Sequence, residues 1–388
     1  MLTYFVQIFK IKRVMKKLIL MLILWLMYAN LFSQDNVTFG KYRKFTSPVL
    51  GGEITYIEHL PNGYEKSDKC YPVVFMMNGQ NISQFANDAA TLDNLSGDRI
   101  PDMILIGISN TGVASNFWSS PNESGLVPAG NKFHTFLKEE LIPEISRNYR
   151  SNGYNILYGQ SNTGLFVMYN FLSDPDLFKA YVVASPMFGW CPEFFLNKTA
   201  AFLKDHPQIS KKLYISYGDL DYVQVLKPIE DFKEVLKQSP PGLEWKVELI
   251  ENTSHVPSST LNNAMLFFFS GCTMTAERKK LSVPEIKAHF NALSREYGFK
   301  VNPKAGVLFD MAIDLGEEQK NDQAIEIVKY LVSLYPGSEH YIYYLGKLQQ
   351  IHGDLESAMG CYNKALKINP KYERAKLALK NLNKSEGN

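Results

Sequence analysis

The chain has 388 residues, of which 45% are hydrophobic and 13% aromatic, so it can bury enough apolar surface for two folded units. Its formal charge is only +2, and it shows no signature of a nucleic-acid-binding protein. The four cysteines lie far apart and have no C-x-x-C spacing, which argues against a zinc site and against a disulfide framework. They are Cys70, Cys191, Cys272 and Cys361, and the sequence leaves open whether any two of them pair.

Residues 1–33 are predicted to be a signal peptide. The basic segment Met15-Lys16-Lys17 leads into a 15-residue apolar run from Leu18 to Phe32, and Ser33-Gln34 follows as a suitable cleavage point. A membrane span needs about 20 apolar residues, so the run is short for the alternative, an uncleaved anchor. Cleavage would leave 36 basic residues against 39 acidic ones. We therefore expect an exported protein, periplasmic or secreted, without a stable membrane anchor.

Residues 34–270 are expected to form an α/β domain. Runs such as PVVFMM, MILIGI and YVVA are apolar throughout, as strands buried on both faces should be. They alternate with helical patterns, which predicts a mainly parallel sheet covered by helices on both sides. The first two strands are predicted to pair as an antiparallel edge hairpin turned at Pro61-Asn62-Gly63. The predicted strands are Glu53–Leu60, Tyr71–Met77, Met103–Ser109, Asn155–Tyr158, Ala180–Ala184, Leu213–Tyr217 and Glu244–Ile250.

The chain from residue 271 onward has a purely helical pattern. Residues 271–302 are expected to form a connecting helix, with Ser282 as its cap and Pro284 near its start. In residues 303–388, small residues and a proline recur 34 positions apart: Ala312, Ala324 and Pro336 match Gly346, Ala358 and Pro370. This spacing predicts a small all-α domain of tetratricopeptide-like repeats with a capping helix.

Ser161 is the candidate nucleophile. It follows Gly159-Gln160 at the point where a predicted strand passes into a predicted helix, which suggests the G-x-S-x-G turn of serine hydrolases. The last glycine of that pattern is replaced by Thr163, and a glycine comes one residue later, at Gly164. By itself this pattern also fits an ordinary polar turn, so the interpretation depends on partners for the serine.

His255 is the candidate general base. It follows the strand KVELIE after a short loop, and the carboxyl ends of strands are where open α/β sheets place their sites. The other histidines lie in helices, on an early strand or in a loop before a proline. The acid should come between serine and histidine in the chain, and either Asp219 or Asp221, after the strand LYISYG, could orient the imidazole.

Acyl transfer also requires two backbone N–H groups that bind the oxyanion. Asn162, directly after the nucleophile, should supply one of them. The other should come from the loop after VVFMM, where Gly79 allows close approach and the N–H of Gln80 is the best donor. The alternative interpretation of Asn78-Gly79 is a simple turn, because this dipeptide is frequent in turns.

Five segments, in order, resemble the enterobactin-esterase and esterase-D-like branch of the α/β hydrolases. The resemblance covers about residues 45–270 and implies an α/β-hydrolase fold with Ser161 as nucleophile, His255 as base, and Gln80 and Asn162 as oxyanion donors. It also favours Asp221 over Asp219, because the family's acid sits three residues after the strand-end glycine. The segments are YPVVFMMNGQ, FHTFLKEELIPEISRNYR, NILYGQSNTGLFVMYNFLSDPDLFKAYVVASP, LYISYGDLD and ENTSHVPSSTLNNAMLFFF.

The sequence departs from this family at two places. The family usually has glycine at the position of Thr163, and we expect the extra side chain to press on the neighbouring strand, since overpacking typically costs about 1–3 kcal/mol. The family also usually has an arginine where this chain reads Gly112-Val113-Ala114-Ser115. Acidic or siderophore-type ligands are therefore not implied.

Together these patterns predict a secreted or periplasmic serine esterase that acts on a small-molecule ester and needs no metal or organic cofactor. A peptidase on the same fold is a further possibility. The rival from another class is an inactive esterase-fold platform whose repeats recruit a protein partner or a second copy of the chain. Thr163 favours that rival, whereas the order of serine, acid and histidine opposes it. No nucleic-acid partner is expected.

Overall fold

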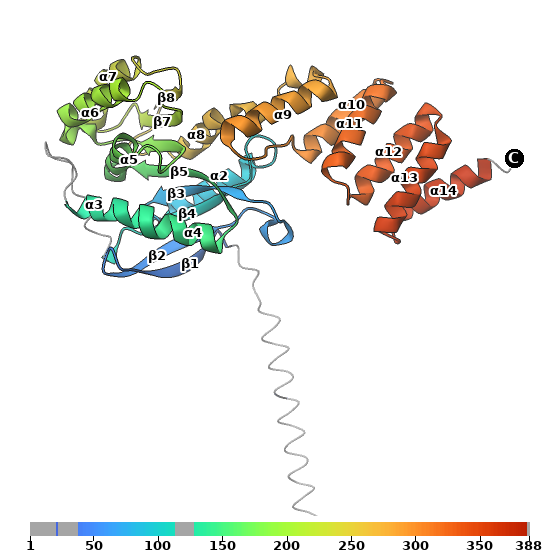
Figure 1. The fold of residues 1–388 in the computed structure, drawn as a ribbon, viewed down its shortest axis with the longest axis horizontal. Helices are drawn as coiled ribbons and strands as arrows, with labels where there is room; N and C mark the ends of the chain where they lie inside the picture. Colours follow the sequence, from blue (N-terminus) through green and yellow to red (C-terminus); the bar gives the residue numbers. More distant parts are fainter. Residues whose placement is uncertain (1–20, 22–37, 113–127, 386–388) are drawn as a thin grey trace, which may run out of the picture. The chain divides into compact units, whose positions relative to one another are not determined.

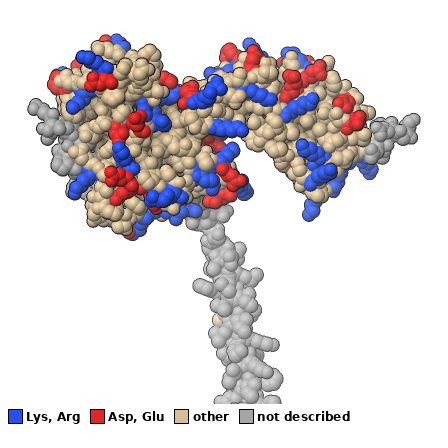
Figure 2. All heavy atoms as spheres, in the orientation of Figure 1, with Lys and Arg blue, Asp and Glu red and all other residues tan. Residues whose placement is uncertain are grey.

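The computed structural model describes residue 21, residues 38–112 and residues 128–385, and the described residues from position 40 onward form one compact unit. The predicted signal peptide lies outside the described residues, apart from Met21, and so does most of the segment that lacks the family arginine. Within the described ranges, no helix is both long and apolar enough to cross a membrane. Figure 2 shows acidic and basic side chains interspersed on the visible face, in keeping with the near balance of charges in the sequence.

An eight-stranded, mostly parallel sheet forms the centre of residues 40–270 (Figure 1). The strand order is β1-β2-β4-β3-β5-β6-β7-β8, and all neighbours from β4 to β8 are parallel, whereas β2 is antiparallel to both of its neighbours. The apolar runs form fully buried strands, as expected for a sheet that is covered on both faces. The strands are β1 (Lys41–Ser47), β2 (Gly52–His59), β3 (Tyr71–Met77), β4 (Ile104–Ile108), β5 (Ser151–Gln160), β6 (Ala180–Ala184), β7 (Lys211–Gly218) and β8 (Leu243–Ile250).

The edge hairpin differs from the prediction. Strand β2 pairs with β1 and β4, not with β3, and the hairpin turn lies at residues 48–51, where Gly51 has a φ of 76°. The segment Pro61-Asn62-Gly63 leads instead into a short 3₁₀ helix, Tyr64–Lys66. Strand β1 was missed because its sequence, KYRKFTS, is mostly polar and exposed, as is typical of an edge strand.

Helices cover both faces of the sheet (Figure 1). On one face α3 to α7 pack on a core that includes Phe75, Phe166 and Ile215, and on the other face α2 and α8 pack on a core with Val74 and Tyr158. This arrangement is that of an α/β hydrolase. The helices are α2 (Ile82–Leu95), α3 (Pro128–Thr135), α4 (Ile142–Asn148), α5 (Asn162–Ser173), α6 (Pro192–Asp205), α7 (Val223–Leu236) and α8 (Thr260–Phe268), and a π-helical stretch, Phe136–Leu141, joins α3 to α4.

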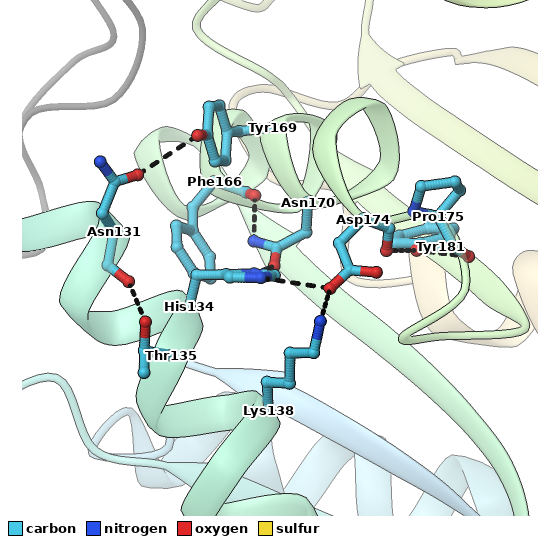
Figure 3. A network of polar contacts seen from close by, with 10 residues as sticks. All are labelled: Asn131, His134, Thr135, Lys138, Phe166, Tyr169, Asn170, Asp174, Pro175 and Tyr181. Carbon is cyan, nitrogen blue, oxygen red and sulfur yellow. Dashed lines mark hydrogen bonds and ion pairs between the residues drawn. The ribbon is translucent and has the colours of Figure 1, made fainter. Parts of the chain in front are cut away.

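A polar network fastens α3 and the π-helical stretch to α5, the helix that begins beside Ser161 (Figure 3). His134 contacts Asn170 Oδ1 through Nδ1 at 2.5 Å and Asp174 Oδ2 through Nε2 at 3.4 Å. Lys138 also donates to Asp174, at 2.8 Å. These contacts therefore fix the carboxyl-terminal end of α5, the end opposite Ser161.

The C-terminal region is entirely helical among its described residues (Figure 1). Ser282 and Glu285 form a capping box at the start of α9, as the cap prediction requires. Small residues lie where helices cross: a Cβ on Gly346 would approach Tyr362 to 2.8 Å. The helices are α9 (Val283–Tyr297), α10 (Ala305–Glu317), α11 (Asn321–Leu334), α12 (Glu339–His352), α13 (Leu355–Ile368) and α14 (Glu373–Ser385).

The helical region shares a hydrophobic core with the α/β part. Ile286 and Phe290 of α9 belong to the same buried cluster as Met265 and Phe268 of α8. Lys304, just before α10, forms an ion pair of 2.6 Å with Asp102, which precedes β4. The connecting helix α9 therefore packs as part of the α/β core as well as joining the two regions.

Candidate active site

Ser161 lies on a sharp turn between β5 and α5. Its backbone has φ 53° and ψ −122°, a conformation that non-glycine residues rarely adopt and that is characteristic of a nucleophile elbow. The turn is held by the Ser161 N–H, which donates to Ala184 O of β6 at 2.8 Å. Gly159 is required two residues earlier, since a Cβ there would lie 2.6 Å from Thr163 O. The serine thus stands at the carboxyl end of a central strand.

The prediction that Thr163 crowds the elbow is wrong. The Thr163 side chain is buried, and its hydroxyl accepts a hydrogen bond from Gln160 N at 2.8 Å and donates one to Gln160 O at 2.7 Å. The close approach to the neighbouring strand occurs at Gly164, where a Cβ would lie 2.9 Å from Val183 Cγ1. The glycine that this contact requires is therefore present, and Thr163 fastens the two ends of the turn together.

His255 and Asp221 complete a chain of hydrogen bonds that begins at Ser161. His255 Nε2 lies 2.8 Å from Ser161 Oγ, and His255 Nδ1 lies 2.6 Å from Asp221 Oδ1. Asp219, the alternative acid, instead accepts a hydrogen bond from the Thr253 N–H at 3.0 Å and stabilises the loop before His255. The three residues come from the carboxyl ends of β5, β7 and β8, where an open α/β sheet places its site.

Ser185, which the sequence analysis did not single out, holds the other oxygen of the Asp221 carboxylate. Its hydroxyl donates to Asp221 Oδ2 at 2.5 Å and accepts from the Val256 N–H at 2.8 Å, so it links the acid to the residue after His255. Burial raises the pKa of Asp221, but hydrogen bonds from His255, Ser185 and the Tyr222 backbone outweigh this effect and keep the pKa below its ordinary value. Asp221 is therefore ionised at neutral pH.

Backbone strain is concentrated around this cluster. Six described non-glycine residues have a positive φ. One of them is Ser161 itself, and Asn78, Ser185 and Val256 lie around the hydrogen bonds that join Ser161, His255 and Asp221. Val256 is the most unusual, because a β-branched residue is strongly disfavoured at its φ of 60°. Strained residues persist only where surrounding contacts fix them, and they cluster at active sites.

The loop after β3 lies beside the elbow, as an oxyanion loop should. Asn78 Nδ2 contacts Thr163 Oγ1 at 3.4 Å, while Asn110 bonds Asn78 Oδ1 at 2.7 Å and Gln80 Oε1 at 3.2 Å. Gly79 is packed so closely on β4 that a Cβ would lie 2.2 Å from Gly107 C. No described group accepts a hydrogen bond from the backbone N–H of Gln80 or of Asn162. Both predicted donors are thus available to a substrate.

Other polar groups and cavities lie away from this cluster. A cavity of about 380 Å³ is lined by Tyr71, Asn152 and Phe299, near the amino ends of β3 and β5, and so lies opposite the Ser161 end of the sheet. All four cysteines are free thiols. Among the described residues, no group of three or more His, Cys, Asp or Glu side chains could hold a metal ion.

Residues 47–240, half of the chain, match the sequence pattern of a protein family described as putative esterases. This stretch contains the serine elbow and Asp221. The chain belongs to this esterase family. The ferri-bacillibactin esterase of Bacillus subtilis is 24% identical to it over 155 residues, which are 34% of this chain and 53% of that enzyme. The chain thus matches about half the length of this curated relative. Family membership supports hydrolase activity on esters.

Solved structures share the fold. The IroE-like serine hydrolase from Shewanella oneidensis superposes with a TM-score of 0.63 at 22% identity, covering 76% of this esterase chain and 99% of the other. An uncharacterised protein from Capnocytophaga ochracea gives 0.65 at 15% identity and covers 87% of this chain and 99% of its own. At these identities the likeness concerns the fold alone.

Proposed function

We propose that this esterase is an exported serine hydrolase that cleaves carboxylic esters through an acyl-enzyme. The observation that carries the proposal is the chain of hydrogen bonds from Ser161 through His255 to Asp221, at 2.8 and 2.6 Å. A serine hydroxyl is a weak nucleophile by itself and becomes effective when an adjacent base removes its proton. Membership of the esterase family supports the same chemistry.

In this proposal His255 acts first as base and then as acid. Its Nε2 takes the proton of Ser161 while Oγ forms a bond to the ester carbonyl carbon, and it then gives that proton to the oxygen of the leaving alcohol. Asp221 accepts a hydrogen bond from Nδ1–H, which selects the tautomer with a free Nε2 and stabilises the imidazolium. The lowered pKa of Asp221 keeps the carboxylate charged during these steps.

The oxyanion that forms at the carbonyl oxygen accepts hydrogen bonds from the backbone N–H groups of Gln80 and Asn162. Fixed donors of this kind are worth about 10²–10³ in rate each. Water then attacks the acyl-enzyme with the help of His255 and releases the acid. Protein groups and water supply every step, so the proposal requires no metal or organic cofactor.

The helical region is proposed to consist of tetratricopeptide-like repeats that bind a protein partner or a second copy of the chain. The small residue Gly346, where a Cβ would lie 2.8 Å from the Tyr362 ring at a helix crossing, supports this assignment. The alternative function is an inactive esterase-fold platform, which the departure at Thr163 favoured. The hydrogen bonds of Thr163 within the elbow instead support a competent nucleophile turn.

Hydrolysis of 4-nitrophenyl acetate by two matched variants tests the proposed roles. Asp221→Asn should lower kcat by about 10⁴-fold at neutral pH, because an amide in that place stabilises the wrong imidazole tautomer. Asp219→Asn, the control, removes a neighbouring charge but keeps an oxygen that can accept the hydrogen bond of the Thr253 N–H, and kcat should change less than about threefold. Equal and small losses in both variants would show that Asp221 does not serve His255.

A further inference from the structure

Large apolar side chains are exposed next to the candidate catalytic histidine. Leu220, Tyr222 and Val223 are 68%, 57% and 62% exposed, and they flank Asp221 on both sides. The ring centroid of Tyr222 lies 4.6 Å from that of His255. Single exposed apolar residues are ordinary on protein surfaces, but adjoining ones mark sites that contact a ligand or a partner.

A fourth exposed apolar side chain comes from the neighbouring strand end. Trp190, 49% exposed, follows β6. The segment that carries it packs closely on the start of α7, since a Cβ on Gly189 would lie 2.7 Å from Gln224 Cα. We call Trp190, Leu220, Tyr222 and Val223 the apolar rim. Its residues follow β6 and β7, and they lie beside the hydrogen bonds that join Ser161, His255 and Asp221.

The position of the apolar rim in the sheet decides which part of an ester would contact it. The oxyanion loop follows β3, on one side of β5, whereas β6, β7 and β8 lie on the other side. His255 must protonate the oxygen of the departing alcohol, so the alcohol part of a bound ester lies over the imidazole. The rim adjoins this imidazole through Tyr222.

We infer that the apolar rim is the binding subsite for the alcohol part of the ester, and that the preferred substrates are esters of alkyl or arylalkyl alcohols. The inference rests on the proposed function, because it takes His255 as the acid that protonates the alcohol. It adds that selectivity resides in the alcohol and depends little on the acyl chain.

Acetate esters of ethanol, butanol and hexanol test the inference, since these alcohols differ little in acidity and the chemical step is matched. A fully buried methylene strengthens binding about fourfold, and a methylene that is covered on one side only strengthens it about twofold. Four added methylenes should therefore raise kcat/KM for hexyl acetate on the order of 10-fold over ethyl acetate, as followed by titration of the released acid. Lengthening the acyl chain to ethyl hexanoate should change kcat/KM less than about threefold.

A double variant locates the effect. The double variant Leu220→Ser, Val223→Ser removes two apolar rim side chains and leaves Ser161, His255 and Asp221 in place. It should lower the ratio of kcat/KM for hexyl acetate to that for ethyl acetate at least about fivefold. The matched control is Ile351→Ser, which removes a 59% exposed side chain from α12 and should leave the ratio unchanged. Labelling of Ser161 by a fluorophosphonate, measured on each protein, reports on a working nucleophile independently of the rim.

Each outcome has a distinct meaning. A labelled, active enzyme with a hexyl-to-ethyl ratio near 1, or with a stronger preference among acyl chains, would overturn the inference and leave the proposed function intact. A high ratio that the double variant does not lower would also overturn it, because the preference would arise elsewhere. Absence of both labelling and ester hydrolysis in the folded protein would overturn the proposed function, and the inference with it.

Discussion

Replacing Thr163 by valine removes one hydroxyl from the elbow while keeping the shape of the side chain. The Thr163 hydroxyl makes two hydrogen bonds to the backbone of Gln160, at 2.8 and 2.7 Å, and the side chain is fully buried. Valine would leave the N–H and the C=O of Gln160 without these partners. An unsatisfied buried polar group costs about 1–3 kcal/mol, so we expect a loss of about 2–4 kcal/mol in the free energy of unfolding.

The same substitution should also slow catalysis, because Gln160 directly precedes Ser161 and a shift of the nucleophile by about 1 Å can reduce the rate on the order of 100-fold. Thr163→Ser is the matched control, since it keeps the hydroxyl and should remain within about 1 kcal/mol and threefold in kcat of the parent protein. Denaturant unfolding and 4-nitrophenyl acetate hydrolysis measure the two effects. If Thr163→Val were as stable and active as Thr163→Ser, the hydroxyl bonds would not hold the elbow.

Two further predictions concern Ser185 and the connecting helix. Ser185→Ala removes a hydrogen bond that lowers the pKa of Asp221 in the folded protein. A carboxyl group with a lowered pKa stabilises the fold at pH values above the pKa of the unfolded chain, and this stabilisation is lost as the pH falls through the folded pKa. Without the Ser185 hydroxyl the loss should occur at a higher pH, so acid unfolding should begin earlier, and kcat should fall about 10-fold. An unchanged acid midpoint in circular dichroism would contradict this. A chain that ends at residue 275 lacks Ile286 and Phe290, exposes the shared core and should aggregate. A chain that ends at residue 385 keeps α14 and should stay soluble in gel filtration; equal solubility would refute the packing argument.

The sequence predicted the parts of the fold that depend on residue type alone. Short continuous apolar runs identified β3, β4 and β6 because strands that are buried on both faces are apolar throughout. The chain order identified Ser161 and His255 and left Asp219 or Asp221 as the acid, and the family resemblance favoured Asp221. The structure brings Ser161, His255 and Asp221 within hydrogen-bonding distance. Such features are visible in a sequence because apolarity and chemical character belong to each residue by itself.

Features that depend on three-dimensional neighbours could not be predicted. Strand β1 is charged and exposed, so only its pairing with β2 makes it a strand. Ser185 looks like any serine after a strand, and its contact with Asp221 spans 36 positions. Thr163 was predicted to crowd the neighbouring strand, because the G-x-S-x-G pattern indicates only that a small residue belongs at this position. The pattern does not show that a hydroxyl there can reach the backbone N–H and C=O of Gln160.

Reaction with a fluorophosphonate tests the central claim, an activated Ser161, most directly. The folded protein should gain the mass of a single phosphonyl group, peptide mapping should place that group on Ser161, and Ser161→Ala should gain none. The reaction depends on His255 as base, so His255→Ala should also remain unlabelled while keeping the native circular dichroism spectrum. An unmodified wild-type protein with a native spectrum, or equal modification of Ser161→Ala, would contradict the account.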